Sequence, residues 1–211
     1  MELLPLASII QGALDFFIKG GFFMLLLLIL SVISVTVMIL RGTAIRRNAV
    51  LPPSISAEIE RLQPGDSLEP LQKLIKQNPS ALGRIVNTVI SHLSWPRGET
   101  IEAVQTRARH EVARLEAGLV VLEIATGIAP LLGLLGTLSG LVGIFASIGS
   151  DPVLVARGIA EALNTTIAGL GVAVPCLVTY NHFQRRIEVM SVEMESMVSD
   201  LIAKCYPQHG A

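Results

Sequence analysis

Charged residues are scarce in this chain, and long stretches have none at all. Asp, Glu, Lys and Arg make up 16% of the 211 residues, whereas a soluble domain usually carries about 25%. Three stretches lack charge altogether, namely residues 20–40, 124–150 and 162–184. Each reaches the ~20 apolar residues that a helix needs to cross a hydrocarbon core of ~30 Å. The sequence therefore excludes an ordinary soluble domain and predicts an all-α membrane protein with three transmembrane helices.

Residues that carry enzyme chemistry are also few. One of the two cysteines, Cys176, lies inside a predicted span and the other, Cys205, lies near the C-terminus, which argues against a disulfide. The four histidines show no metal-ligand spacing, and no pairing of a nucleophile with a base stands out. The glycine-rich stretch Gly133–Gly143 contains no lysine, unlike a phosphate-binding loop. Neither an enzyme activity nor a cofactor is therefore expected.

Lysine and arginine are distributed unevenly around the predicted spans. If residues 41–123 and 185–211 face the cytoplasm, that side holds fourteen of the sixteen basic residues. The positive-inside rule then predicts an N-terminus outside and a C-terminus in the cytoplasm. The predicted segments are an outer-face amphipathic helix (1–19), transmembrane helix 1 (20–41), a cytoplasmic helical segment and stalk (42–115), transmembrane helix 2 (116–149), a short periplasmic loop (150–156), transmembrane helix 3 (157–185) and a cytoplasmic tail (186–211).

Helical periodicity extends beyond the second and third spans. An apolar stripe with spacings of three and four begins at Ile101 and enters the second span with no proline between them. A single helix from about 99 to 148, ~75 Å long, is therefore predicted. A similar pattern after Arg186 predicts that the third helix continues into the tail. The first span is rich in Leu, Ile and Phe and is expected to face lipid, and the rest of 42–115 is assigned a structural role.

Small residues line one side of the second and third spans. They are Gly133, Gly136, Gly140 and Gly143 on the second span, and Gly158, Ala162, Thr166, Gly169 and Ala173 on the third. Such spacing lets membrane helices approach closely. Packing within one subunit would explain the pattern. Packing between subunits, and hence an oligomer, is favoured because two helices can bury only their mutual faces.

Hydrogen-bonding side chains are rare deep in these two spans. They are Thr137, Ser139, Asn164, Thr165 and Thr166. Thr137 and Thr166 lie on the small-residue sides, so both are predicted to point into a crowded interior. Glu123 and Glu161 lie near the span ends, and no carboxylate lies in the middle of the membrane. If the chain conducts protons, the central acid must therefore come from another polypeptide.

Two sequence blocks resemble the ExbB/TolQ/MotA proton-channel family. The first is Ala-Pro-Leu-Leu-Gly-Leu-Leu-Gly-Thr over 129–137. The second comprises Gly-Ile-Ala-Glu-Ala-Leu over 158–163 and Thr-Thr-Ile-Ala-Gly-Leu over 165–170, followed by Val174-Pro175 and Tyr180-Asn181. The resemblance is close over roughly 105–186. The three-span form is similar to ExbB and TolQ more than to the four-span flagellar stator subunit.

The resemblance implies a pentameric ring in the bacterial inner membrane, with the second and third helices around a central pore. It implies that a dimer of single-span ExbD- or TolR-like subunits sits inside and supplies the membrane Asp, with a TonB- or TolA-like protein as a further partner. Thr137 and Thr166 would line the proton route, with Thr165, Glu161 and Ser139 as further pore-lining candidates. Two residues depart from the family pattern: Ser139, where Trp is common, and Asn164, where a small or apolar residue is usual.

The function implied is that of a channel or stator subunit in a motor driven by the proton motive force, which energises transport or envelope processes. The alternative is a membrane oligomer that holds a partner and conducts nothing. A neighbouring reading frame that encodes one span with a central Asp would favour the motor. A self-sufficient ion channel is disfavoured, because this chain has no charged residue in the middle of the membrane. Catalysis in the cytoplasmic segment has no supporting motif.

Overall fold

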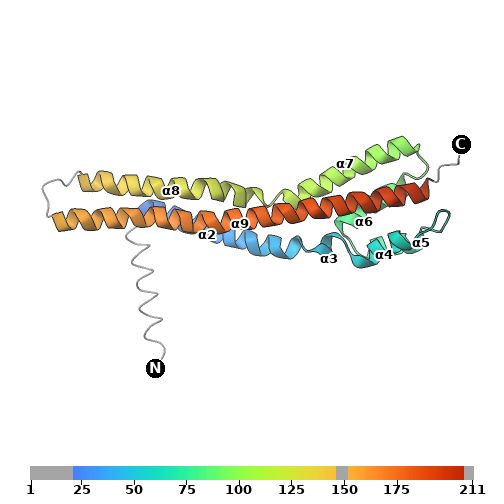
Figure 1. The fold of residues 1–211 in the computed structure, drawn as a ribbon, viewed down its shortest axis with the longest axis horizontal. Helices are drawn as coiled ribbons and strands as arrows, with labels where there is room; N and C mark the ends of the chain where they lie inside the picture. Colours follow the sequence, from blue (N-terminus) through green and yellow to red (C-terminus); the bar gives the residue numbers. More distant parts are fainter. Residues whose placement is uncertain (1–20, 146–151, 207–211) are drawn as a thin grey trace, which may run out of the picture. The chain divides into compact units, whose positions relative to one another are not determined.

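The computed structural model describes residues 21–145 and 152–206, and within these ranges it is helical with no strand. The helices are α2 (Gly21–Ala44), α3 (Arg47–Val50), α4 (Pro53–Arg61), α5 (Glu69–Gln77), α6 (Ala81–Ser91), α7 (Arg97–Glu116), α8 (Val120–Phe145) and α9 (Pro152–Cys205) (Figure 1). The predicted all-α fold class is confirmed for this part of the chain. The amphipathic helix predicted over 1–19 lies outside the described residues, as does most of the loop predicted over 150–156.

Three of these helices are long and apolar enough to cross a membrane, as predicted. They are α2 with 24 residues, α8 with 26 and α9 with 54. Pro130 and Pro175 lie inside α8 and α9 without ending either helix. The helix that contains the third span continues past Arg186 as far as Cys205.

The continuous helix predicted from about 99 to 148 is interrupted, so that prediction was wrong. Residues Ala117–Leu119 form a turn between α7 and α8. Gly118 lies in this turn, and glycine is about 1 kcal/mol less favourable than alanine inside a helix. The side chain of Arg41 occupies the space that a Cβ on Gly118 would need. The missing side chain therefore weakens the helix at this point and lets Arg41 pack against the backbone.

The chain forms two compact units, and the first contains the candidate membrane spans. Its described part comprises residues 21–39, 119–145 and 152–181. Leu27 of α2 is 1% exposed and packs in one cluster with Ala129 of α8 and Ala173 of α9. Most of the large apolar side chains of α2 are exposed, whereas Leu27 is buried by this contact. One side of α2 therefore packs against the other two helices while the rest remains open.

Glycine brings the backbones of α8 and α9 into contact. A Cβ on Gly169 would lie 2.5 Å from the carbonyl oxygen of Ala129. A Cβ on Gly133 would lie 2.8 Å from the carbonyl oxygen of Thr165, and one on Gly140 would lie 2.9 Å from the Cβ of Ala162. Atoms do not approach so closely, so a larger residue at these positions would push the helices apart. The small-residue sides of the two spans thus pack against each other within one chain.

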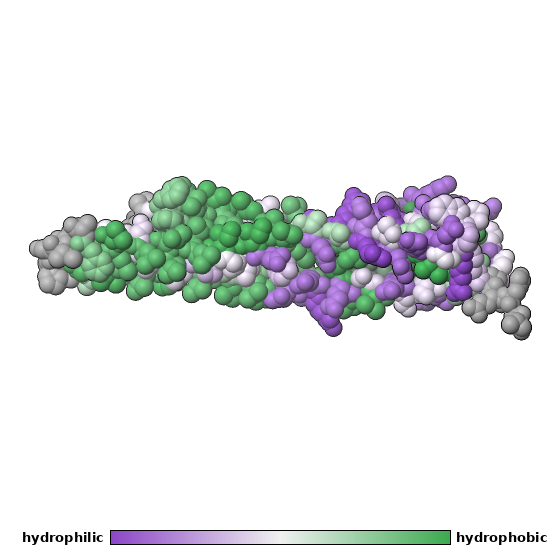
Figure 2. Space-filling model, turned by 90° about the horizontal axis from the view of Figure 1, so that it is seen from above, coloured by the Kyte–Doolittle hydropathy of each residue, from purple (hydrophilic) through white to green (hydrophobic). Residues whose placement is uncertain are grey.

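The second unit comprises residues 40–118 and 182–206 in its described part. Its buried apolar side chains come from the short helices and from the end of α9, and include Ile55, Ile59, Leu71, Leu82, Ile85, Ile187 and Leu201. The Ser80 hydroxyl accepts a hydrogen bond of 3.0 Å from the amide of Gly83 and so caps α6. Figure 2 shows hydrophobic residues over the visible face of the first unit and hydrophilic residues gathered over the second.

Replacing Gly169 by Ala should destabilise the packing of α8 on α9. The added methyl group would meet backbone atoms, and overpacking of this kind costs about 1–3 kcal/mol. Gly171 provides a matched control two residues along the same helix, because no described residue outside its own stretch of α9 comes within 4 Å of its Cβ position. Gly171→Ala should leave stability unchanged or raise it by up to about 1 kcal/mol through helix propensity. Unfolding by a denaturing detergent, followed by circular dichroism, measures the stability of both variants. Equal losses of stability in Gly169→Ala and Gly171→Ala would contradict the close contact at Gly169.

Candidate functional site

Three threonine hydroxyls meet between α8 and α9. Thr137 comes from α8, and Thr165 and Thr166 are consecutive on α9. The Oγ1 of Thr137 lies 2.6 Å from that of Thr166 and 3.2 Å from that of Thr165. A Cβ on Gly136 would lie 2.8 Å from the Thr165 hydroxyl, so glycine at this position leaves room for the contact. We call Thr137, Thr165 and Thr166 the threonine cluster.

Two backbone carbonyls complete the cluster. The Thr165 hydroxyl lies 2.8 Å from the Ala162 oxygen and 3.0 Å from the Gly133 oxygen. The Thr137 hydroxyl lies 3.0 Å and 3.2 Å from the same two oxygens, and Thr166 reaches the Gly133 oxygen at 3.3 Å. Each hydroxyl donates one proton and can accept others. The cluster therefore has several donor arrangements that use the same heavy-atom positions.

The three threonines differ in how accessible they are. Thr165 is 2% exposed and Thr137 is 7% exposed, so both are enclosed by the helix pair. Thr166 is only half-buried and lies at the edge of the α8–α9 contact. A molecule that lies beside the helix pair could thus reach the cluster through Thr166. The Thr137 hydroxyl lies directly behind it.

The other two predicted pore-lining residues do not join the threonine cluster. Glu161 is partly exposed, and one of its carboxylate oxygens lies 3.3 Å from Nε of Arg157, one turn before it on α9. Ser139 is exposed. It follows Thr137 by two residues, which places it about 200° round the helix from that side chain. Ser139 therefore lies outside the contact with α9.

The predicted small-residue positions are divided among different neighbours. Gly133, Gly136, Gly140, Ala162 and Gly169 lie in the contact between α8 and α9, Gly158 faces the side chain of Ile144, Ala173 packs in the cluster with Leu27, and Gly143 is exposed. Contact within the chain thus accounts for most of the small-residue pattern. The spacing of these same residues in the sequence favoured contact between subunits.

No carboxylate contacts the threonine cluster within the described parts of the three spans. Glu123 lies in the first turn of α8, well before Thr137. Glu161 precedes the α9 threonines by a full turn and pairs with Arg157. Hydroxyl groups can relay a proton between acids but do not hold a charge at neutral pH. The described spans thus place hydroxyl groups at this position with no acid beside them.

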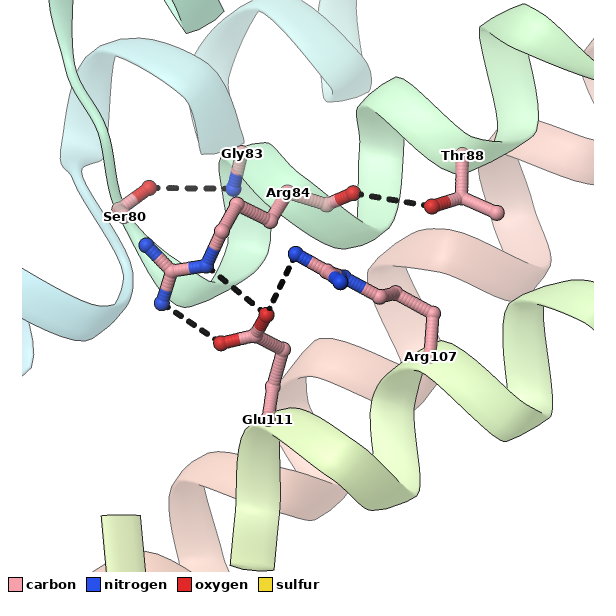
Figure 3. Close-up of polar contacts among 6 residues, drawn as sticks. All are labelled: Ser80, Gly83, Arg84, Thr88, Arg107 and Glu111. Carbon is pink, nitrogen blue, oxygen red and sulfur yellow. Dashed lines mark hydrogen bonds and ion pairs between the residues drawn. The ribbon is translucent and has the colours of Figure 1, made fainter. Parts of the chain in front are cut away.

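A second polar centre, which the sequence did not predict, lies in the other unit. Glu111 of α7 is 1% exposed, and its carboxylate accepts hydrogen bonds of 2.8 Å from Nε and 2.6 Å from Nη2 of Arg84 on α6. Nη2 of Arg107 lies 2.9 Å from the same carboxylate (Figure 3). The spacing of Arg107 and Glu111 is a recognisable ion-pair signal on a helix. Arg84 lies 27 residues from Glu111, so only the fold reveals its part.

The ionisation of Glu111 depends on its arginine neighbours. Burial raises the pKa of this carboxyl group, but the hydrogen bonds and charge of Arg84, together with the charges of Arg107 and Arg114, outweigh burial and hold the pKa below its ordinary value. The hydrogen bond to Glu111 in turn raises the pKa of Arg84. The carboxylate is therefore charged at neutral pH and links α6 to α7.

Comparison with known proteins gives one family and several relatives. The model of the MotA/TolQ/ExbB proton channel family matches residues 77–196, a range that includes the threonine cluster and Glu111. The chain is 33% identical over 180 residues to an ExbB-like biopolymer transport protein of Synechocystis sp., which covers 79% of this chain and 68% of that protein. It is 26% identical over 208 residues to the biopolymer transport protein ExbB of Neisseria meningitidis, and the match covers 86% of this chain and 89% of that protein. It is 29% identical over 185 residues to the Tol-Pal system protein TolQ of Pseudomonas aeruginosa, covering 79% of each.

Replacing Glu111 by Gln should destabilise the second unit by about 1.5–3 kcal/mol, because Arg84 and Arg107 lose the charged hydrogen bonds of their shared anion. Since the folded pKa lies below the ordinary value of about 4.3, the stabilisation is complete above that pH and is lost as the pH falls through the folded pKa. The melting temperature of the purified wild-type chain should exceed that of Glu111→Gln by a constant amount near neutral pH. This difference should shrink under acid conditions.

Glu188→Gln is the matched control, because Glu188 makes an exposed ion pair with Arg185. This variant removes the same charge and should leave the melting temperature unchanged. If the difference in melting temperature between the wild type and Glu111→Gln stayed the same at low pH, the role given to the charge of Glu111 would be contradicted.

Proposed function

Since the chain belongs to the MotA/TolQ/ExbB proton channel family, we propose that it is the channel or stator subunit of a motor driven by the proton motive force. The motor would energise transport or envelope processes, in keeping with the names of the ExbB and TolQ relatives. The chain is a multi-pass membrane protein. In the proposal it lies in the bacterial inner membrane with its N-terminus in the periplasm and its C-terminus in the cytoplasm, the orientation favoured by its basic residues.

The threonine cluster is the observation that supports this proposal best. It places exchangeable hydroxyl protons inside the span unit, with Thr166 at the accessible edge and Thr137 behind it. The described spans offer no acid at this position. The proposal therefore includes a single-span ExbD- or TolR-like partner whose membrane Asp takes up and releases protons beside Thr166.

The chemistry of the step follows from the cost of charge in an apolar medium. A carboxylate moved through hydrocarbon is strongly disfavoured, whereas a neutral carboxylic acid with a hydrogen-bond partner is tolerated. In the proposal, Thr166 donates a hydrogen bond to the acid or to an intervening water when the acid is charged, and accepts one when it is neutral. The partner acid would pass the apolar interface only in its neutral form.

Thr165 has a different role in this proposal. It is the most deeply buried member of the threonine cluster, and its hydroxyl lies within hydrogen-bond distance of carbonyl groups of both helices. These contacts fix the distance between α8 and α9 and hold the Thr137 hydroxyl beside Thr166. Thr165 is thus a positioning residue and does not meet the partner acid itself.

The assembly belongs to the proposal as well. A pentamer of this chain would surround two copies of the partner, and a TonB- or TolA-like protein would carry the energy onward. Five surrounding copies cannot present equivalent positions to two acids at once. Each protonation would then favour a stepwise rotation of one ring relative to the other.

Replacing Thr166 by Val should lower proton-coupled activity by about tenfold or more, because the loss of one hydrogen bond of ~1.4 kcal/mol in the transfer step corresponds to that factor. Valine keeps the shape of threonine and removes only the hydroxyl. Proton flux into liposomes that contain the chain and its genomic partner, followed with a pH-sensitive dye, measures the effect.

Thr126→Val is the matched control, because the Thr126 hydroxyl on α8 bonds to the Leu122 oxygen of its own helix at 2.9 Å. It should conduct like the wild type. Full activity of Thr166→Val would refute the role of this residue. Normal assembly with no flux in the wild type would point to the scaffold alternative.

Thr165→Ser and Thr165→Val separate positioning from proton transfer. Serine keeps the hydroxyl and should retain most of the flux. Valine leaves two carbonyl oxygens with fewer donors, and should lower both the flux and the stability of the helix pair by about 1–2 kcal/mol. A valine variant with reduced flux but unchanged unfolding in denaturing detergent would contradict the positioning role.

A further inference from the structure

Two of the five hydrogen-bonding side chains deep in α8 and α9 have no hydrogen-bond partner in residues 21–145 and 152–206. They are the hydroxyl of Ser139 on α8, which is exposed, and the amide of Asn164 on α9, which is half-buried. Hydrocarbon offers no hydrogen bonds, so polar groups at this depth are normally paired. Both side chains therefore call for a partner beyond these described residues.

The two side chains lie on the outer sides of the helix pair. Ala162 and Thr165 face α8, as the contacts with Gly140 and Gly136 show. Asn164 follows Ala162 by two residues and so lies about 200° round the helix from it. Ser139 is related to Thr137 in the same way on α8. Because both side chains lie outside the α8–α9 contact, Ser139 and Asn164 of one chain do not bond to each other.

The same contacts set the relative depth of the two residues. The two helices run antiparallel, with Gly136 opposite Thr165 and Gly140 opposite Ala162. Ser139 is the residue before Gly140, and Asn164 is the residue before Thr165. Their backbone positions along the helix axes therefore differ by no more than about two residues, or about 3 Å.

We propose that Ser139 of each copy hydrogen-bonds to Asn164 of the adjacent copy in the membrane oligomer. The inference rests on the ring assembly of the proposed function. In a ring about an axis normal to the membrane, every copy of a residue has the same depth, so a head-to-tail contact joins only residues at equal depth. Ser139 and Asn164 meet this condition from two different helices.

A second copy of this chain fits these groups better than the single-span partner does. The amide has two donor hydrogens and an acceptor oxygen, and the hydroxyl supplies one of each. A ring of neighbours satisfies every Asn164 in the same way. Two partner subunits inside a larger ring would leave most copies of Asn164 unpaired.

Cross-linking between two tagged forms of the full chain tests the contact. Both forms carry Cys176→Ala and Cys205→Ser, which remove the two natural thiols. One form also carries Ser139→Cys and the other Asn164→Cys, and both are co-expressed with the genomic partner. A short bifunctional thiol reagent applied to isolated membranes should join the two tags, and a chain with both substitutions should give a ladder of oligomers.

Leu131→Cys in place of Ser139→Cys is the matched control. Leu131 is also exposed on α8, but it lies eight residues away, about 12 Å in depth. Its cross-link to Asn164→Cys should be about tenfold weaker, because thiol pairs join only over short distances. Equal yields in the two mixtures would overturn the proposal, as would a stronger cross-link between two copies of either single variant.

The outcome is separable from that of the proposed function because cross-linking requires assembly and not proton flux. A cross-link between the Ser139→Cys form and the Asn164→Cys form, in a preparation without proton flux, would support the Ser139–Asn164 contact and count against the motor. Proton flux without a cross-link between these two forms would refute the Ser139–Asn164 contact and leave the motor unaffected. A preparation that stays monomeric by light scattering and gives no cross-link would refute the contact and the ring together.

Discussion

The backbone contact between α8 and α9 is the interaction on which the rest of the span unit depends. It exists because Gly133 and Gly169 have no side chain to separate the helices, so that the carbonyl of Ala129 lies where a Cβ of Gly169 would be. At this separation a threonine on one helix reaches a carbonyl group on the other. The same contact forms the surface of small residues on which Leu27 of α2 packs.

The two units are stabilised in different ways because their solvents differ. Lipid is as apolar as leucine, so membrane helices gain little from burying large apolar side chains against each other. Close packing and hydrogen bonds such as those of the threonine cluster must hold them together. The second unit has an apolar core of ordinary kind and a buried carboxylate, Glu111, that is tolerated only because Arg84 and Arg107 compensate its loss of hydration.

Polar groups in the spans are sorted by the side of the helix on which they lie. The threonine cluster bonds within the chain and keeps one member, Thr166, at an accessible edge. Ser139 and Asn164 lie on the outer sides and bond to none of the described residues. This division gives one set of groups to the proposed proton route and the other to the proposed contact between copies, so the two proposals draw on different residues.

Composition and periodicity by themselves determined the number of spans, the helical class and the sides of the helices that carry Thr137 and Thr166. These properties are local: a run of apolar residues or a spacing of three and four has the same meaning wherever the helix is placed. Only the tertiary structure decided which glycines pack within the chain, that the helix breaks at Gly118 beside Arg41, and that Glu111 meets Arg84. Each of these depends on the rotation and register of one helix against another, which no single stretch of sequence encodes.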